Sequence, residues 1–159
     1  MQSSETVSER LSQVIEDNKG LDGPCLPTLI AITQEFGYVP PEAVPMLAKA
    51  LNLSRAEVHG VLSFYHELHT RPQGRHVVRL CRAESCQAAG CEAVAAEVEK
   101  TLGVKPGDTT ADGEVTLETV YCFGNCALSP AAMVDGRLMG RATAERVLGA
   151  IGKSVKAAE

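Results

Sequence analysis

The sequence of 159 residues contains no tryptophan, and only 4% of its residues are aromatic. A large recognition surface rich in aromatic side chains is therefore not expected. The net charge is −5, and no run of arginine or lysine alternates with aromatic residues, so the chain lacks the positive field that attracts nucleic acid. No apolar stretch approaches the roughly 20 residues that a membrane-spanning helix needs. We therefore expect neither a nucleic acid partner nor insertion into a membrane.

Signals for export are also lacking. The segment from Met1 to Leu11 is polar and acidic, which matches neither a signal peptide nor a transit peptide. We therefore expect a cytoplasmic protein, in a compartment too reducing to maintain structural disulfides. Hydrophobic residues make up 45% of the chain and charged residues 22%, the ordinary balance of a folded protein.

The usual signatures of a substrate site are missing too. No Ser/His/Asp constellation and no G-x-G-x-x-G loop stands out. The segment His66-Glu67-Leu68-His69 is one residue short of the H-E-x-x-H zinc motif, and surface or capping roles are expected for these histidines and for His59. The sequence therefore predicts no catalytic residue of its own.

The first seventy residues show helical periodicity and no strand signal. We expect four helices, over residues 6–18, 24–36, 42–51 and 54–68. The second should bury one stripe of residues, namely Leu26, Leu29, Ile30, Thr33 and Phe36. The fourth should begin at Ser54, which can form a capping box with Glu57. Its expected buried stripe is Val58, Val61, Leu62, Tyr65 and Leu68. The sequence thus predicts an N-terminal helical bundle over residues 1–71.

Strand-like sequence first appears after the turn-rich segment 70–74, so we assign residues 72–159 to a second domain. Candidate strands cover residues 76–80, 115–120, 131–134 and 137–139. Between the first two, one helix carries on one face Cys91, Val94, Ala95, Val98 and Leu102. The dipeptide Asp135-Gly136 predicts a tight hairpin, and Thr143 should cap a final helix through Ile151. This order predicts an α+β fold whose second domain has a four-stranded mixed sheet with flanking helices.

Two cysteine pairs are expected on loops that follow candidate strands. Cys81 and Cys86 have C-x4-C spacing, and Cys122 and Cys126 have C-x3-C spacing. Four thiols in a reducing compartment indicate a metal centre, and iron with sulfide is the favoured occupant. Such a cluster is an anion, so backbone amides and not carboxylates should line it. Gly124 and Asn125 tolerate positive φ, which would let the second loop fold over the cluster without strain.

Other uses of the thiols fit their spacing less well. Structural zinc sites usually have C-x2-C knuckles, and a thioredoxin-type redox dithiol needs C-x-x-C; neither is present. A plant-type ferredoxin would need a cysteine where this chain has Ala89. Cys91 shares an apolar helical stripe and Cys25 lies among helices, so both are expected to be packing residues. A zinc-bound scaffold remains the alternative from another class of protein.

The cysteine motifs, together with the 107–113 loop and the Cys-Phe-Gly-Asn-Cys run, resemble the thioredoxin-like 2Fe-2S subunit family, which includes the small peripheral-arm subunit of respiratory complex I. The resemblance extends upstream through the segments 36–40 and 60–65. It implies one 2Fe-2S cluster on Cys81, Cys86, Cys122 and Cys126. It also implies a helical N-terminal domain that docks on an FMN- and NAD-binding subunit.

Within that family, the short C-terminal segment 127–138 looks most like the gamma subunits of soluble, molybdenum-dependent NAD+ formate dehydrogenases. That resemblance implies formate oxidation in a molybdenum-containing alpha subunit and NADH formation in an FMN-bearing beta subunit. This chain would be a non-catalytic electron-transfer subunit with its cluster near the flavin. The equivalent subunits of complex I and of NAD-linked hydrogenase diaphorases are the alternatives, and a cluster that only stabilises the domain is another.

Overall fold

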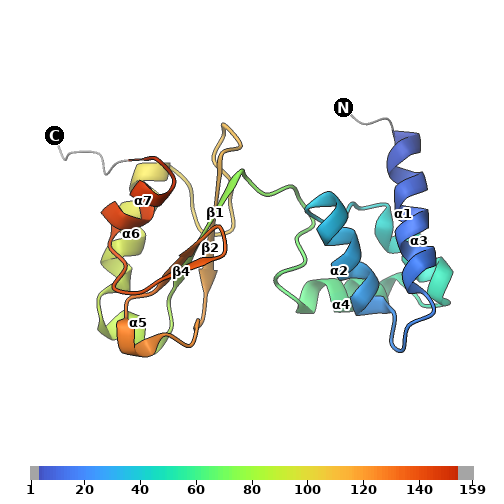
Figure 1. The fold of residues 1–159 in the computed structure, drawn as a ribbon, viewed down its shortest axis with the longest axis horizontal. Coiled ribbons are helices and arrows are strands. Elements are labelled where there is room, and N and C mark those ends of the chain that lie inside the picture. The colour runs from blue at the N-terminus through green and yellow to red at the C-terminus, as the bar shows by residue number, and fades with distance from the viewer. Residues whose placement is uncertain (1–3, 154–159) are drawn as a thin grey trace. The chain divides into compact units, whose positions relative to one another are not determined.

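The computed structural model describes residues 4–153. The chain divides into two compact units (Figure 1), Met1–Pro72 and Gln73–Glu159. Each unit has its own hydrophobic core. The first unit is helical, and the second combines helices with one sheet. The predicted α+β fold with a four-stranded mixed sheet is confirmed. Among the described residues, no helix has the length and apolar character required to cross a membrane.

From residue 4 onward, the helical unit contains four helices: α1 (Ser4–Asn18), α2 (Cys25–Phe36), α3 (Ala43–Leu51) and α4 (Arg55–Phe64). The predicted capping box at the start of α4 is present. The Ser54 hydroxyl accepts the Glu57 N–H at 3.2 Å, and the Glu57 carboxylate accepts the Ser54 N–H at 2.8 Å. α2 ends at Gly37, which adopts the left-handed conformation and donates its N–H to the Thr33 carbonyl.

Two details of the helical prediction are wrong. α4 ends at Phe64, four residues before Leu68, and Tyr65 is 38% exposed. Leu68 is buried from the following turn, because the His69 carbonyl there accepts the N–H of Val39 at 2.7 Å and draws that segment onto the core. In α2, the predicted Ile30 is 42% exposed, so the buried stripe is rotated around the helix. Its fully buried members are Thr28, Leu29 and Ile32.

The second unit is built on a sheet of strand order β2-β1-β3-β4. Its strands are β1 (His76–Cys81), β2 (Val115–Val120), β3 (Ala132–Val134) and β4 (Arg137–Met139). β1 and β2 are parallel, whereas β3 runs antiparallel to β1 and to β4. Val78 and Leu80 are buried on the face that packs against α6 (Cys91–Leu102) and α7 (Ala144–Ala150). The residues between these buried positions point to the other face of the sheet. There Arg79 of β1 and Glu118 of β2 form an ion pair at 2.7 Å.

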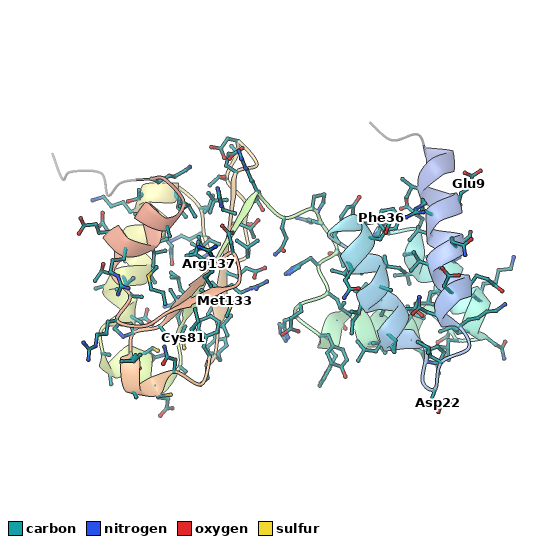
Figure 2. The ribbon with its side chains drawn as sticks, in the orientation of Figure 1. Glu9, Asp22, Phe36, Cys81, Met133 and Arg137 are labelled. Atoms are coloured by element: carbon teal, nitrogen blue, oxygen red, sulfur yellow. The ribbon has the colours of Figure 1, made fainter. Side chains whose placement is uncertain are left out.

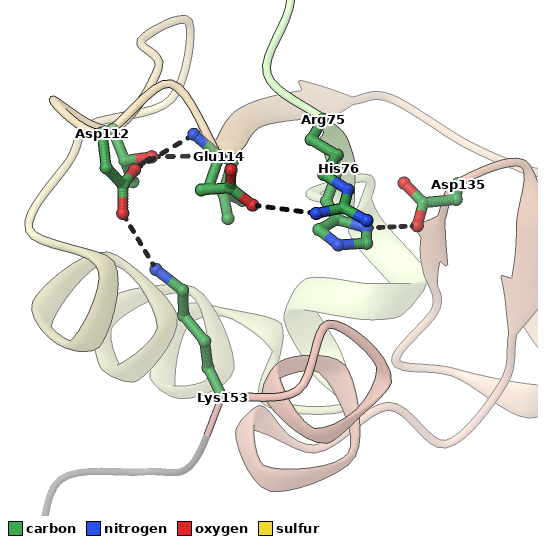
Figure 3. Close-up of polar contacts among 8 residues, drawn as sticks. Arg75, His76, Asp112, Glu114, Asp135 and Lys153 are labelled. Carbon is green, nitrogen blue, oxygen red and sulfur yellow. Dashed lines mark hydrogen bonds and ion pairs between the residues drawn. The ribbon is translucent and has the colours of Figure 1, made fainter.

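The predicted hairpin forms, and its turn is tied to the start of β1. Asp135 and Gly136 both have positive φ, 49° and 77°, as a two-residue type I′ turn requires. The Asp135 carboxylate contacts His76 Nδ1 at 2.7 Å and accepts the Val77 N–H at 2.9 Å. Figure 3 shows the His76–Asp135 contact beside the ion pair between Asp112 and Lys153. The predicted cap of α7 is also present, because the Thr143 hydroxyl accepts an N–H.

The single helix expected after β1 is in fact two. α5 (Glu84–Ala88) contains Cys86, and the chain then breaks at Gly90, whose φ is +85°. α6 therefore begins at Cys91, and its buried face includes Cys91, Ala95 and Val98 as predicted. The break turns the chain between the two helices, so Cys86 and Cys91 do not belong to one continuous helical stripe.

Candidate metal centre

All four candidate cysteines lie near one edge of the sheet. Cys81 is the last residue of β1, and Cys122 follows β2 by two residues. Because β1 and β2 are parallel and Cys81 is in register with Val120, both strands end at the same edge of the sheet. Figure 2 shows Cys81 at the end of the sheet where α5 lies. The topology thus brings together segments that are some forty residues apart.

The first pair is buried. Cys81 and Cys86 are each 2% exposed, and their thiols contact each other within a small apolar cluster. The expectation that both pairs lie on loops is wrong here, because Cys81 ends a strand and Cys86 lies inside α5. Burial raises the pKa of Cys81, while the amides of Ala83 and Phe123 oppose that rise.

The pKa of Cys86 is shifted in the opposite direction to that of Cys81. Burial alone would raise the pKa of its thiol, but hydrogen bonding of the sulfur with the Ser129 hydroxyl and with the Ala131 amide holds the pKa below its usual value. These donors favour the thiolate, which is the form that binds metal. The surroundings of this pair are therefore hydrogen-bond donors and apolar groups.

The second pair is exposed. Cys122 and Cys126 lie on the surface, and their thiols also contact each other, which raises the pKa of Cys126. Gly124 has a φ of +76° as expected, and its N–H points at the Cys122 sulfur at 3.2 Å. Asn125 does not adopt positive φ; Cys122 itself does, at +115°. A non-glycine residue in this conformation is strained, and such residues occur most often at functional sites.

Two serines connect the cysteine pairs, and neither was predicted from the sequence. Ser85, in α5, and Ser129, after the 3-10 helix η1 (Cys126–Leu128), place their hydroxyl oxygens 2.9 Å apart. Ser129 Oγ also lies 2.8 Å from the Cys126 carbonyl and 3.6 Å from the Cys86 sulfur. The sequence offered little signal for them: Ser85 directly precedes Cys86, and Ser129 follows Cys126 by three residues.

Gly140 is a third residue near the cysteines that was not predicted from the sequence. A Cβ added there would lie 2.6 Å from Leu128 Cβ and 3.0 Å from Asn125 Nδ2. The residue after β4 must therefore be glycine for the chain to approach η1 so closely. The N–H of the next residue, Arg141, donates to the Leu128 carbonyl and fixes this contact. This close approach holds the segment that carries Cys126 against the residues that follow β4.

The donor arrangement fits a cluster with two metal ions. Within residues 4–153, no three Cys, His, Asp or Glu side chains surround a single ion site; the thiols occur as two contacting pairs. A 2Fe-2S cluster needs two thiolates on each iron, whereas a structural zinc ion needs four donors around one point. Amides of Ala83, Phe123, Ala131 and Gly124 face the sulfurs, as an anionic cluster requires.

The two remaining cysteines have different surroundings. Cys91 is 4% exposed beside the first pair, and burial raises the pKa of its thiol, assisted by the neighbouring Glu92 carboxylate. A nearby carboxylate is unfavourable for an anionic cluster. Cys25 packs at the edge of the helical core, where burial also raises its pKa. Their assignment as packing residues remains a prediction.

The α+β fold and the paired thiols fit a small iron–sulfur protein. The family model for thioredoxin-like 2Fe-2S ferredoxins matches residues 11–154, which is most of the chain. The chain therefore belongs to the thioredoxin-like 2Fe-2S ferredoxin family, and its cofactor is a single 2Fe-2S cluster.

Curated relatives support this assignment. The chain is 40% identical over 104 residues to the NADH-quinone oxidoreductase subunit designated E of Pseudomonas aeruginosa, covering 65% of this chain and 63% of that protein. It is 36% identical over 116 residues to the same subunit of Escherichia coli K12, covering 73% and 70%. For the Rhizobium meliloti counterpart designated E 2, the identity is 37% over 134 residues, covering 84% and 79%.

A solved structure shows the same fold. A chain of an NAD+-reducing NiFe-hydrogenase in the air-oxidised state superimposes with a TM-score of 0.65 and 27% identity. The match covers 78% of this chain and 22% of the hydrogenase chain. This chain thus spans under two thirds of the Pseudomonas relative and about a fifth of the hydrogenase chain.

Proposed function

We propose that this chain is the electron-transfer subunit of an NAD-linked oxidoreductase complex, with its cluster held by Cys81, Cys86, Cys122 and Cys126 close to the FMN of a flavoprotein subunit. The observation that carries the proposal is that the four thiols, as two contacting pairs, lie near the same edge of the sheet, one pair buried and the other at the surface. The exposed pair provides a short path to a partner's redox centre.

The chain's own residues would fix the cluster and disperse its charge. When bound, a 2Fe-2S cluster accepts and releases one electron at a time. The buried Cys81 and Cys86 would anchor one iron, and Cys122 and Cys126 would hold the other at the surface. Backbone amides directed at the sulfurs stabilise negative charge without a countercharge. Neither role requires a substrate site on this chain.

The particular complex is a finer proposal. The resemblance of the C-terminal segment favours the gamma subunit of a cytoplasmic, molybdenum-dependent NAD+ formate dehydrogenase, in which a molybdenum-containing alpha subunit oxidises formate. The identities of 36–40% to NADH-quinone oxidoreductase subunits favour the complex I alternative at least as strongly. The structural match to an NAD+-reducing hydrogenase supports the third possibility. All three share an NAD-linked flavoprotein partner in this proposal.

Isolation of the native complex tests the proposal. The chain would be affinity-tagged at its own locus, purified without oxygen, and the associated subunits identified together with their metals and flavin. We expect an FMN-containing subunit, molybdenum, and NAD+ reduction by formate. Quinone-linked NADH oxidation or hydrogen-dependent NAD+ reduction would instead assign the alternative complexes. Recovery of the iron-loaded chain without any flavoprotein would contradict the electron-transfer role itself.

We also propose that the helical unit is the docking module for the flavoprotein. It contains a surface pocket of about 370 Å³ lined mainly by apolar residues of α2, α3, α4 and the turns that flank them, including Leu26, Leu53 and Val61. Beside it, Phe64 is 73% exposed and packs edge-on against Tyr65, with ring centroids 5.1 Å apart. Exposed aromatic side chains next to an apolar pocket are typical of protein interfaces.

A further inference from the structure

The hydroxyl of Ser129 occupies the space between the two cysteine pairs. It lies 3.6 Å from the Cys86 sulfur, 2.9 Å from the Ser85 hydroxyl and 2.8 Å from the Cys126 carbonyl. Cys86 is 2% exposed, so water has little access to its sulfur. Water therefore cannot readily replace a hydrogen bond that Ser129 makes to this sulfur.

Binding of a metal reverses the direction of the Ser129–Cys86 contact. In the free thiol, the Cys86 S–H donates to Ser129 Oγ. A metal-bound cysteine is a thiolate and has no hydrogen, so the contact persists only if the Ser129 hydroxyl donates to sulfur. The hydroxyl would then give up its bond to the Cys126 carbonyl. That carbonyl still accepts the backbone N–H of Ser129 at 3.2 Å, so it is not left unpaired.

Ser85 can orient this donor. Its hydroxyl is 2.9 Å from Ser129 Oγ, and either oxygen can be the donor. If Ser85 donates to Ser129, the Ser129 oxygen has an incoming hydrogen bond and its own hydrogen is free to point at Cys86. The resulting chain runs from Ser85 to Ser129 to the Cys86 sulfur, and polarisation along it strengthens the last bond.

We propose that Ser129, oriented by Ser85, is a positioning residue that donates a hydrogen bond to the Cys86 sulfur in the loaded protein and raises the reduction potential of the centre. The inference rests on the ligand role of Cys86 in the proposed function. Reduction by a one-electron donor, a reduced flavin in the complex, takes the net charge of the four-thiolate centre from roughly −2 to about −3. A donor hydrogen bond stabilises the more negative state more strongly, so the potential rises.

The test is a redox titration of the loaded protein followed by EPR, with dithionite as reductant. In Ser129→Ala the equilibrium constant for reduction should fall roughly tenfold, because loss of this hydrogen bond should cost the reduced, more negative state about 1.4 kcal/mol more than the oxidised state. For a one-electron couple this is a shift of about 59 mV to more negative potential. Ser129→Thr keeps the hydroxyl and should restore most of the wild-type value. Ser85→Ala should shift the potential in the same direction by a smaller amount.

A matched control is Ser63→Ala, which removes a hydroxyl bonded to the Gly60 carbonyl in α4 and should leave the potential unchanged. An unchanged midpoint in an iron-replete Ser129→Ala protein overturns the inference, as does a Ser129→Thr value equal to that of Ser129→Ala. Reduced iron content with an unchanged midpoint would show a purely structural role and also overturn it.

Two further results keep the inference distinct from the proposed function. If Ser129→Ala cannot be loaded, Ser85→Ala carries the test, and an unchanged midpoint there overturns the inference. If the wild-type chain shows no spin-half signal after reduction, the proposed function fails, and the inference fails with it. A loaded wild-type chain with insensitive serine variants would overturn the inference alone.

Discussion

At the scale of single residues, the two cysteine pairs differ in what their side chains contribute to the fold. Cys81 and Cys86 are buried and pack with Ala131 and Phe123, whereas Cys122 and Cys126 are exposed. A hydroxyl in place of a buried sulfur must be desolvated, and at the surface it stays hydrated. Exchange of any of the four should weaken the cluster, but only exchange of the buried pair should also weaken the cluster-free fold.

This difference gives a prediction. Serine at any of the four positions should sharply lower iron and sulfide content, because the harder oxygen suits an iron–sulfur core poorly. In the cluster-free protein, Cys81→Ser should reduce the free energy of unfolding by about 1–3 kcal/mol, and Cys122→Ser by well under 1 kcal/mol. The measurements are iron and labile-sulfide analysis, with about two of each expected per wild-type chain, and urea unfolding of the cluster-free variants.

The control is Cys91→Ala, which should keep the EPR signal of the reduced protein. It should cost on the order of 1 kcal/mol through lost packing. Cys25→Ala should likewise keep the cluster. Loss of the cluster in Cys91→Ala with its retention in Cys86→Ala would reverse the ligand assignment.

At the scale of elements, the sequence predicted those whose signals are local. The Ser54–Glu57 capping box and the Asp135-Gly136 turn each fix a backbone conformation within four residues, and both are present. The end of α4 and the burial of Leu68 depend on a hydrogen bond to Val39, about thirty residues away, so periodicity could not reveal them.

The candidate site shows the same limit. The pairing of Cys81 with Cys86 and of Cys122 with Cys126 could be expected from their spacing. The contact of Ser85 with Ser129 spans 44 residues and arises only because β1 and β2 are parallel and end at one edge. The sequence also offered no sign of the positive φ of Cys122, since Gly124 and Asn125 were the residues expected to adopt positive φ. The residue types of the ligands could be inferred from local spacing, but the groups that surround these ligands are brought together only by the sheet.

The β3–β4 hairpin provides a prediction with a pH dependence. Asp135→Ala should destabilise the cluster-free protein by about 2 kcal/mol, because it removes the bonds to His76 and Val77 and leaves, at a φ of +49°, a residue without the polar side chain that lets aspartate tolerate this conformation. Asp135→Asn should cost less, since asparagine tolerates this φ and its side-chain oxygen can still accept the Val77 N–H. Urea unfolding at pH 7 measures both.

The sign of the pH effect follows from the Asp135 pKa. Burial would raise it, but the hydrogen bonds from His76 and Val77 hold the folded-state pKa below the ordinary value of 3.8. A lowered folded pKa gives stability that is present above the unfolded pKa and lost as the pH falls through the folded one. The advantage of wild type over Asp135→Asn should therefore shrink below about pH 4. A difference that stays constant from pH 7 to pH 3 would contradict this account.

At the scale of the whole molecule, the two units have separate cores. The helical core includes Leu29, Leu47 and Val58, and the sheet core includes Val78, Leu117 and Val147. The candidate ligands all belong to the unit that begins at Gln73. Each unit buries its own apolar residues, so the sheet unit should fold and hold the cluster without the helical one.

The last prediction separates cluster binding from docking. A chain beginning at Gln73 keeps the hydrogen bond from Gln73 to Glu118 and the whole of β1, so its iron content and EPR signal should match those of the full chain. It should lose most of its affinity for the flavoprotein, because the apolar pocket and the exposed Phe64 are removed. Affinity would be measured by titration against the purified FMN subunit, with Phe64→Ala in the full chain as a milder matched variant expected to weaken binding by more than about 1 kcal/mol. If the truncated chain binds with unchanged affinity, docking belongs to the sheet unit, where Tyr121 and Leu128 are exposed near the second cysteine pair.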